Sequence, residues 1–192
     1  MEVYFTAMTS IKRLQLTLAI LKPHVVSYPF SLHDIRRIVL DNGFYIVRSL
    51  RQTISHKQAE QFYNEHKSKF FYNRLLSFMT SGPSESYILA REDSIKFWRH
   101  LMGPTKVFQS QISNPDSIRA VHGLTDTRNA THGSDSEESA RREISILFPD
   151  FSFDRWQNIE EPHFRNGKVP TTTVIQYYNT SNILLLLKKN IM

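Results

Sequence analysis

The sequence predicts an α+β fold, a ferredoxin-like βαββαβ antiparallel sheet with helices packed on it, on one side. Three observations support this class. Strand-like alternation and helical periodicity follow one another along the chain. Breaker residues separate the segments. With 192 residues, 40% of them hydrophobic and 22% charged, the chain suits a single globular domain with a substantial core.

The first strand and the first long helix are predicted from residues 14–43. In residues 14–22 leucine and isoleucine occupy alternate positions, which is the period of a strand, and Pro23 ends it. Ser31 and Asp34 have the spacing of a capping box, and apolar residues at helical spacing follow them. A short amphipathic helix is therefore expected here, ending before Gly43.

The next four elements repeat this alternation. Residues 44–53 are rich in β-forming types and predict a second strand, and Ser55 is placed to cap a polar helix after it. Residues 70–79 have helical periodicity. A short apolar segment, 86–90, predicts a buried strand, and residues 93–102 predict an amphipathic helix ended by glycine.

The last part of the predicted fold is less regular. Residues 104–128 show no sustained periodicity, so a long, ordered and functional loop is expected. The closing strand is placed within 124–131. Ser134 and Glu137 again have capping-box spacing, which predicts a helix over about residues 135–148.

Charge, cysteine content and hydropathy limit the function. The chain has no cysteine, which excludes disulfides, thiolate zinc sites and cysteine catalysis. Its net charge of +6 favours anionic partners such as nucleotides. Dispersed basic residues and the lack of a stacking motif argue against a specific nucleic-acid binder. The longest apolar run, ILLLL at 183–187, is too short to span a membrane, and the N-terminus has the wrong charge order for a secretory signal, so an intracellular protein is expected.

The string NATHGSDS, residues 129–136, raises a question about its histidine. Because histidine is mostly neutral at pH 7, one ring nitrogen of His132 has a free lone pair that can attack phosphorus. A phosphohistidine can then pass its phosphoryl group to a second acceptor. A polar histidine in a loop before a serine-capped helix fits the same string, and the motif alone leaves both interpretations open.

Three neighbours suit the interpretation as a nucleophile. Glu143 lies at the edge of the core face of the predicted helix and would fix the tautomer of the ring. Gly133 would permit a sharp turn. Ser134 would either cap the helix or form a hydrogen bond to the transferred group. The other histidines show no metal-ligand spacing, so a zinc site is not expected.

Further motifs accompany this string, in order along the chain: ILKP, FFYNRLL, SGP, LMGPT, GLTDTRN and REI with FPDF after it. Together with NATHGSDS they resemble the nucleoside diphosphate kinase family over about residues 14–151, and most closely its divergent sixth animal class. The resemblance implies a nucleoside diphosphate kinase-like domain over 14–151, an N-terminal extension, 1–13, and a C-terminal extension, 152–192.

The resemblance also implies an activity. The enzyme would transfer the γ-phosphoryl group of a nucleoside triphosphate, such as ATP, to nucleoside diphosphates by a ping-pong mechanism through phospho-His132. Mg²⁺ would be carried on the nucleotide phosphates, with no metal held directly by the protein. Glu143 would orient His132. The residues implied to act in catalysis are His132, Glu143, Lys22, Tyr63, Asn129 and Ser134.

The nucleotide site is implied in the same way. Phe71 would stack on the base with Leu75 beside it, while cationic and polar side chains would bind the phosphates. Taken singly, each also fits an ordinary structural role, since Phe71 and Leu75 have the spacing of a core helix. The residues implied to bind the nucleotide are Lys22, Phe71, Leu75, Arg99, Thr105, Arg119 and Asn129.

The chain departs from the family pattern at three places. His24 and Val25 stand where the family usually has Asp and Gly, and Ala120 replaces a glycine. The segment from Thr105 to Arg119 is a few residues longer than in the common form, so the hexamer of the family is not carried over, while self-association stays open. These departures motivate two alternatives, a weakly active or inactive nucleotide-binding regulatory protein with a protein partner, and a protein histidine kinase. The resemblance implies a mitochondrial location, and a cytoplasmic one stays open.

Overall fold

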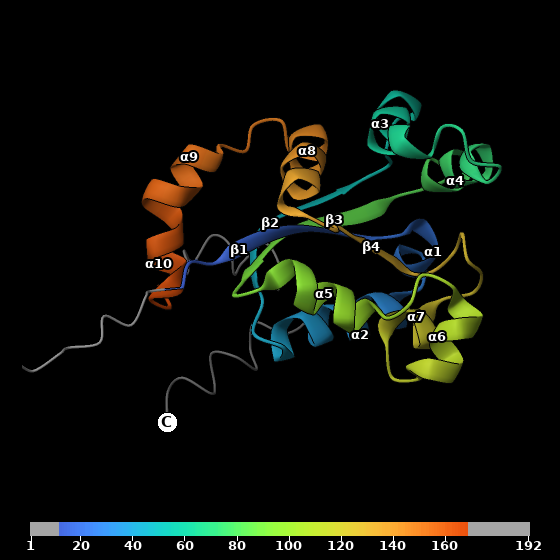
Figure 1. Ribbon diagram of the computed structural model, residues 1–192, viewed down its shortest axis with the longest axis horizontal. Helices are drawn as coiled ribbons and strands as arrows, with labels where there is room; N and C mark the ends of the chain where they lie inside the picture. Colours follow the sequence, from blue (N-terminus) through green and yellow to red (C-terminus); the bar gives the residue numbers. More distant parts are fainter. Residues whose placement is uncertain (1–11, 169–192) are drawn as a thin grey trace, which may run out of the picture.

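The computed structural model describes residues 12–168, and the statements below concern that part of the chain. The alternating leucines near its start form strand β1, which lies inside a four-stranded antiparallel sheet of order β2-β3-β1-β4 (Figure 1). This is the ferredoxin-like order, so the predicted fold class is confirmed. The strands are β1 (Gln15–Leu21), β2 (Tyr45–Gln52), β3 (Ser84–Arg91) and β4 (Thr131–Gly133).

The helices fall into four groups along the chain. After β1 come α1 (Pro23–Val26) and α2 (Pro29–Asp41). Between β2 and β3 come α3 (His56–Phe62), a 3₁₀ turn (Asn64–His66) and α4 (Tyr72–Met79). Between β3 and β4 come α5 (Ser94–Met102), α6 (Val107–Ser113) and α7 (Ile118–His122). After β4 come α8 (Glu137–Leu147), α9 (Phe153–Arg155), a π-helical turn (Trp156–Glu160) and α10 (Glu161–Arg165).

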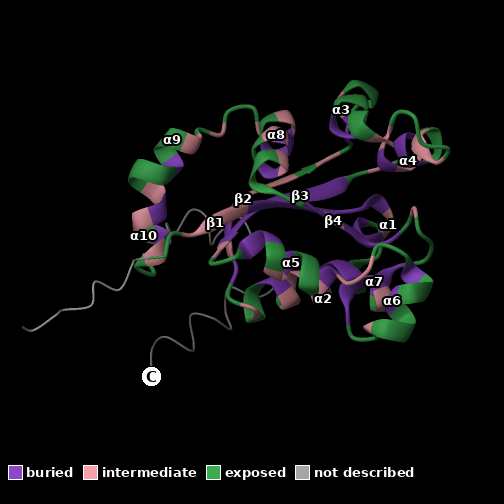
Figure 2. Cartoon of the chain, in the orientation of Figure 1, coloured by how far each residue is buried: buried purple, intermediate pink, exposed green. Residues whose placement is uncertain are grey.

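Helices cover both faces of the sheet. The crossover helices α2 and α5 pack on the face of Ala19 and Leu21, while α3, α4 and α8 pack on the face of Leu18 and Ile20 (Figures 1 and 2). The expectation of helices on one side is therefore right for the crossovers and wrong for the remainder. The reason is in β1, where both sets of alternate side chains are apolar and buried, so each face needs a cover.

The two predicted caps at Ser31 and Ser55 have different outcomes. Ser55 caps α3 and forms a capping box with Gln58, as predicted. In contrast, α2 begins at Pro29, where the fixed φ of proline suits the first helical position. Ser31 lies inside this helix, and its hydroxyl meets Nδ1 of His122 at 3.1 Å.

The segment predicted as a long loop, 104–128, contains the helices α6 and α7. They span seven and five residues, which is too short for helical periodicity to emerge in the sequence. Their apolar side chains are also divided, because Val107 and Ile118 are buried whereas Phe108 is 75% exposed. No apolar stripe therefore marks either helix.

The chain continues in helical form beyond Phe151, within the segment expected to be a C-terminal extension. Trp156 and Phe164 are buried in the same cluster as Leu18, and the backbone N–H of Leu14 donates to Glu161 at 3.0 Å. The boundary at residue 151 stays a prediction, and the ILLLL run lies outside the described residues. No helix within residues 12–168 is both long enough and apolar enough to cross a bilayer.

We expect Phe164→Ala to lower the free energy of unfolding by roughly 3–5 kcal/mol, because it removes an aromatic ring from the core. The ring is 1% exposed and lies 5.3 Å from the ring of Trp156. Urea unfolding measures the loss. Ile159→Ala is the matched control, since Ile159 is 57% exposed in the same segment and should change stability by less than about 0.5 kcal/mol. Equal, small effects would mean that the segment adds nothing to the core.

Candidate active site

His132 lies on strand β4, so it occupies neither the tight turn nor the loop that the sequence suggested. It pairs with Ile20 of β1, and Trp98 Nε1 donates to its backbone oxygen at 3.2 Å. The closing strand exists as predicted but overlaps 124–131 only at Thr131. It has just three residues, and of these only Thr131 is of a type that favours a strand. The pairing points His132 to the sheet face of α3 and α8, where its ring meets that of Phe62 at 5.0 Å.

Glu143 orients the imidazole of His132. The ring's Nε2 lies 3.0 Å from Glu143 Oε2, and Ser134 Oγ donates to the same oxygen at 2.7 Å. Ser134 is itself fixed, because its Oγ accepts from the backbone N–H of Leu18 at 3.2 Å. Among the residues that the structure describes, none forms a hydrogen bond with Nδ1 of His132. The His132 side chain is 23% exposed, so Nδ1 is the nitrogen left for a reaction partner.

The pKa of Glu143 decides which ring nitrogen carries the proton. Burial opposes ionisation of this carboxyl, but the charge and hydrogen bond of His132, the hydroxyl of Ser134 and the charge of Arg142 hold its pKa below the usual value. Glu143 is therefore a carboxylate at neutral pH and can only accept a hydrogen bond. A neutral His132 then carries its proton on Nε2 and its lone pair on Nδ1.

The roles predicted for Gly133 and Ser134 need correction. Ser136, not Ser134, caps α8, since its side chain accepts from the N–H of Ser139 at 3.1 Å. Gly133 makes no sharp turn, because it lies in β4. A Cβ at this residue would lie 2.4 Å from Cδ1 of Trp98, so glycine is needed for close approach.

Lys22, the residue directly after β1, forms a polar pair with Asn129. Lys22 Nζ donates to Asn129 Oδ1 at 2.6 Å and to the carbonyl of Thr127 at 3.1 Å, and Asn129 Nδ2 donates to the carbonyl of Thr105 at 3.0 Å. Ala130 has a left-handed φ of 66°, which is rare for a residue with a Cβ. Because the residue is alanine and not glycine, its type does not indicate a left-handed backbone.

Two buried cations, Lys22 and Arg119, bond to residues at or just before β4. Arg119 donates to the carbonyls of Gly103 at 2.9 Å and Thr131 at 3.2 Å. Burial, together with the charge of Arg119, lowers the pKa of Lys22 to about 7. Burial and the charge of Arg99 lower the pKa of Arg119 to about 10. Within residues 12–168, neither cation has a carboxylate partner, so this end of the sheet suits an anion such as phosphate.

The remaining predicted residues lie around this group. Tyr63 is buried with its ring 6.5 Å from that of His132, and burial followed by the charge of Glu143 raises its pKa. Thr105 is exposed and its Oγ1 lies 3.4 Å from Arg119 Nη1. Phe71 is half-buried at the start of α4, and Arg99 is exposed on α5. Leu75 is buried on α4, in the core cluster.

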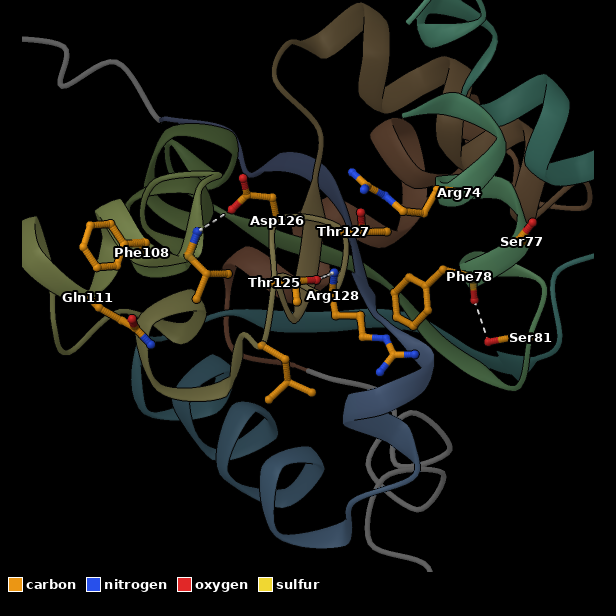
Figure 3. Close-up of a pocket in the computed structure, with 12 residues that line it drawn as sticks. Arg74, Ser77, Phe78, Ser81, Phe108, Gln111, Thr125, Asp126, Thr127 and Arg128 are labelled. Carbon is orange, nitrogen blue, oxygen red and sulfur yellow. Dashed lines mark hydrogen bonds between the residues drawn. The ribbon is translucent and has the colours of Figure 1, made fainter. Parts of the chain in front are cut away.

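A cavity of about 900 Å³ opens between α4, α6 and the loop of residues 124–128. Figure 3 shows Arg74 and Phe78 of α4 across from Phe108 and Gln111 of α6. Thr127 also lines it, and because its carbonyl accepts from Lys22, the cavity borders the polar pair. The sequence predicts none of these lining residues as site residues, because α6 is too short to be recognised within the expected loop.

The departures from the family pattern are accommodated without backbone strain. Val25 lies in α1 and is buried, and Ala120 lies in α7, so both have ordinary helical backbone. His24 is held beside Phe78 with ring centroids 5.5 Å apart, and burial lowers its pKa to about 4.

No group of three His, Cys, Asp or Glu side chains in the described part of the chain is arranged to hold a metal ion.

Comparisons with known proteins agree with this geometry. The family model for nucleoside diphosphate kinase matches residues 15–153. Nucleoside diphosphate kinase 6 of Danio rerio is 52% identical over 160 residues, covering 83% of this chain and 91% of that protein. Nucleoside diphosphate kinase 6 of Homo sapiens is 54% identical over 157 residues, covering 81% and 84%. A crystal structure of the Aquifex aeolicus nucleoside diphosphate kinase superposes with a TM-score of 0.68 at 36% identity, covering 70% of this chain and 95% of that one.

The fold and the match to the family model define the class: an α+β protein of a family that binds nucleotides. The chain belongs to the nucleoside diphosphate kinase family. Its resemblance to the sixth animal class is confirmed by the relatives from fish and human.

We expect Gly133→Ala to lower the free energy of unfolding by roughly 1–3 kcal/mol, because the added methyl group overlaps the indole of Trp98. Thermal and urea unfolding measure the change. Gly82→Ala is the control, since a Cβ there meets only Pro23 at 3.9 Å, an ordinary contact. A Gly133→Ala protein as stable as the Gly82→Ala protein would contradict the close approach.

Lys22→Met should change how stability depends on pH. Since the folded pKa of Lys22 is about 7, the unfolded chain binds more protons than the folded one from there up to about pH 10, and wild-type stability gains from rising pH in that window. The variant lacks this gain. Its stability relative to wild type should therefore fall between about pH 6.5 and about pH 9.5, measured by urea unfolding at both. If the stability of the variant relative to wild type stayed constant or rose between these two pH values, Lys22 would have an ordinary pKa.

Proposed function

We propose that the protein transfers the γ-phosphoryl group of a nucleoside triphosphate to a nucleoside diphosphate in two steps, through phospho-His132. The observation that carries the proposal is the Glu143–His132 pair, which leaves Nδ1 without a hydrogen bond. Two buried cations, Lys22 and Arg119, bond to Asn129 and Thr131 at the same end of the sheet. Family membership supports the same reaction.

In the first step the lone pair of His132 Nδ1 attacks the γ-phosphorus. The N–P bond forms as the bond from phosphorus to the bridging oxygen breaks, and the nucleoside diphosphate leaves with that electron pair. Glu143 stabilises the positive charge that develops on the ring through Nε2–H. In the second step the terminal oxygen of another nucleoside diphosphate attacks the same phosphorus, and the electron pair returns to Nδ1.

The cations carry the charge of the phosphoryl oxygens. Phosphoryl transfer needs positioning and charge neutralisation more than acid-base chemistry. Lys22 and Arg119 are held in place by carbonyl and amide oxygens, so they need no reorganisation when the oxygens develop charge. Arg99 and Thr105 are assigned to the outer phosphates, and Asn129 positions Lys22. Tyr63 and Ser134 are assigned to the surroundings of His132.

Mg²⁺ fits as a companion of the nucleotide. The described residues offer no carboxylate and histidine set for direct coordination, whereas Mg²⁺ commonly binds through substrate phosphates. When bound there it neutralises phosphate charge. The base is assigned to Phe71, with Leu75 beneath it, and an aromatic face accepts any base.

The alternatives concern turnover, acceptor and assembly. A weakly active or inactive nucleotide-binding protein, acting through a protein partner, is favoured by the exposed apolar residues Phe108, Ile112 and Leu124 around the cavity, which are 75%, 69% and 64% exposed. A protein histidine kinase would use the same phosphohistidine with a different acceptor. Self-association and a mitochondrial or cytoplasmic location stay expectations.

We expect γ-labelled ATP to label the wild-type protein and a diphosphate chase with ADP, GDP or UDP to remove the label as triphosphate. His132→Gln should take up no label, because the amide lacks a nucleophilic ring nitrogen. His33→Gln is the matched control and should label normally, since it removes a histidine of α2 that lies outside the site. Equal labelling of the His132→Gln protein would exclude the mechanism. Label that the diphosphates cannot remove would favour one of the two alternatives.

A further inference from the structure

The two oxygens of Glu143 have different partners. Oε2 is shared by the imidazole of His132 and the hydroxyl of Ser134. Oε1 lies 3.7 Å from Nη2 of Arg142. Within the described residues, Arg142 supplies the one guanidinium or ammonium group within 4.0 Å of Glu143.

Arg142 is held where its charge reaches this carboxylate. Its Nη1 donates to the backbone oxygen of Phe62 at 3.3 Å, which ties α8 to the end of α3. Its Nη2 is buried and makes no hydrogen bond, and it lies between Glu143 and Glu65, whose Oε1 is 3.8 Å away. The preceding residue, Arg141, points elsewhere, with its guanidinium 4.7 Å from the centre of the Phe153 ring.

The charges around Glu143 make this contact significant. Facing the carboxylate are His132 from β4, Ser134 from the following loop, Tyr63 from the end of α3, and Arg142 from α8 itself. Glu65 of the 3₁₀ turn approaches Arg142 from outside and is 57% exposed. The Glu143 side chain is 3% exposed and burial opposes its ionisation, so removing the charge of Arg142 would raise its pKa.

Protonation of Glu143 would disable the nucleophile. A neutral carboxyl group can donate its proton to Nε2, which moves the ring proton to Nδ1. The lone pair would then face Glu143 rather than the incoming phosphorus. The tautomer of His132 therefore depends on the ionisation of Glu143, and through it on the charge of Arg142.

We propose that Arg142 is a positioning residue that keeps Glu143 ionised and so holds His132 in the tautomer with Nδ1 free. The catalytic consequence rests on the proposed function, whereas the tautomer itself does not. Arg142 acts only through Glu143 and has no contact with the reacting atoms.

The test compares Arg142→Gln, Arg142→Lys and Arg141→Gln with the wild type. The initial rate of His132 labelling by ATP is measured against pH. Arg142→Gln should move the acidic limb of the profile upward by roughly one pH unit, so that the rate falls about tenfold at pH values below both limbs while the rate near pH 8 changes little. Arg142→Lys keeps the positive charge, so its acidic limb should lie close to that of the wild type. Arg141→Gln should match the wild type.

A second measurement is independent of nucleotide turnover. Nitrogen-15 NMR of nucleotide-free protein reports which ring nitrogen of His132 is protonated, and Arg142→Gln should increase the Nδ1–H form at mildly acidic pH. An unchanged tautomer and an unchanged acidic limb, with only a lower melting temperature, would overturn the proposal and leave Arg142 as a structural tie to Phe62. If the wild type takes up no label, the proposed function fails, and the tautomer measurement still decides the role of Arg142.

Discussion

The pairing of β4 with β1 is the constraint on which the site depends. It joins only three residue pairs, and the middle pair sets His132 against Ile20. Through this pairing one end of the sheet collects groups from distant parts of the chain. Lys22 follows β1 directly, Arg119 donates to the carbonyl beside His132, and Ser134 accepts from the backbone of β1. A ladder this short is stable because helices cover both of its faces.

The charges of the site are arranged for a ligand more than for the folded chain alone. Two cations are buried with carbonyl and amide oxygens as their partners, and burial lowers the pKa of both. One carboxylate, Glu143, is buried against the ring of His132. Such groups reduce stability unless an anion joins the cations, which is the pattern expected where function takes priority over stability. The rest of the core, which is apolar and closely packed, compensates for this cost.

The sequence predicted the order of the strands, most helices and the central pair of His132 and Glu143. Periodicity succeeded for β1 and α5, and the content of β-forming residues succeeded for β2. It failed for α6 and α7, which are too short, and for β4, whose Thr-His-Gly composition does not favour a strand. Spacing also misassigned the caps of α2 and α8, because α2 begins at Pro29 without a side-chain cap and Ser136, rather than Ser134, caps α8. The contacts of Arg142 and the left-handed backbone of Ala130 depend on tertiary packing, so no local pattern could predict them.

The contact between Trp98 and Gly133 has a consequence for how this family member can vary. The indole fills the volume beside the glycine and donates to the backbone oxygen of His132. The residues that would best reinforce a strand, valine and isoleucine, are therefore barred from the last residue of β4 while Trp98 is present. A smaller residue in place of Trp98 would admit them but would remove the indole donor. Trp98 and Gly133 can therefore be replaced only together. As long as both are present, β4 keeps a glycine that weakens its own preference for strand conformation.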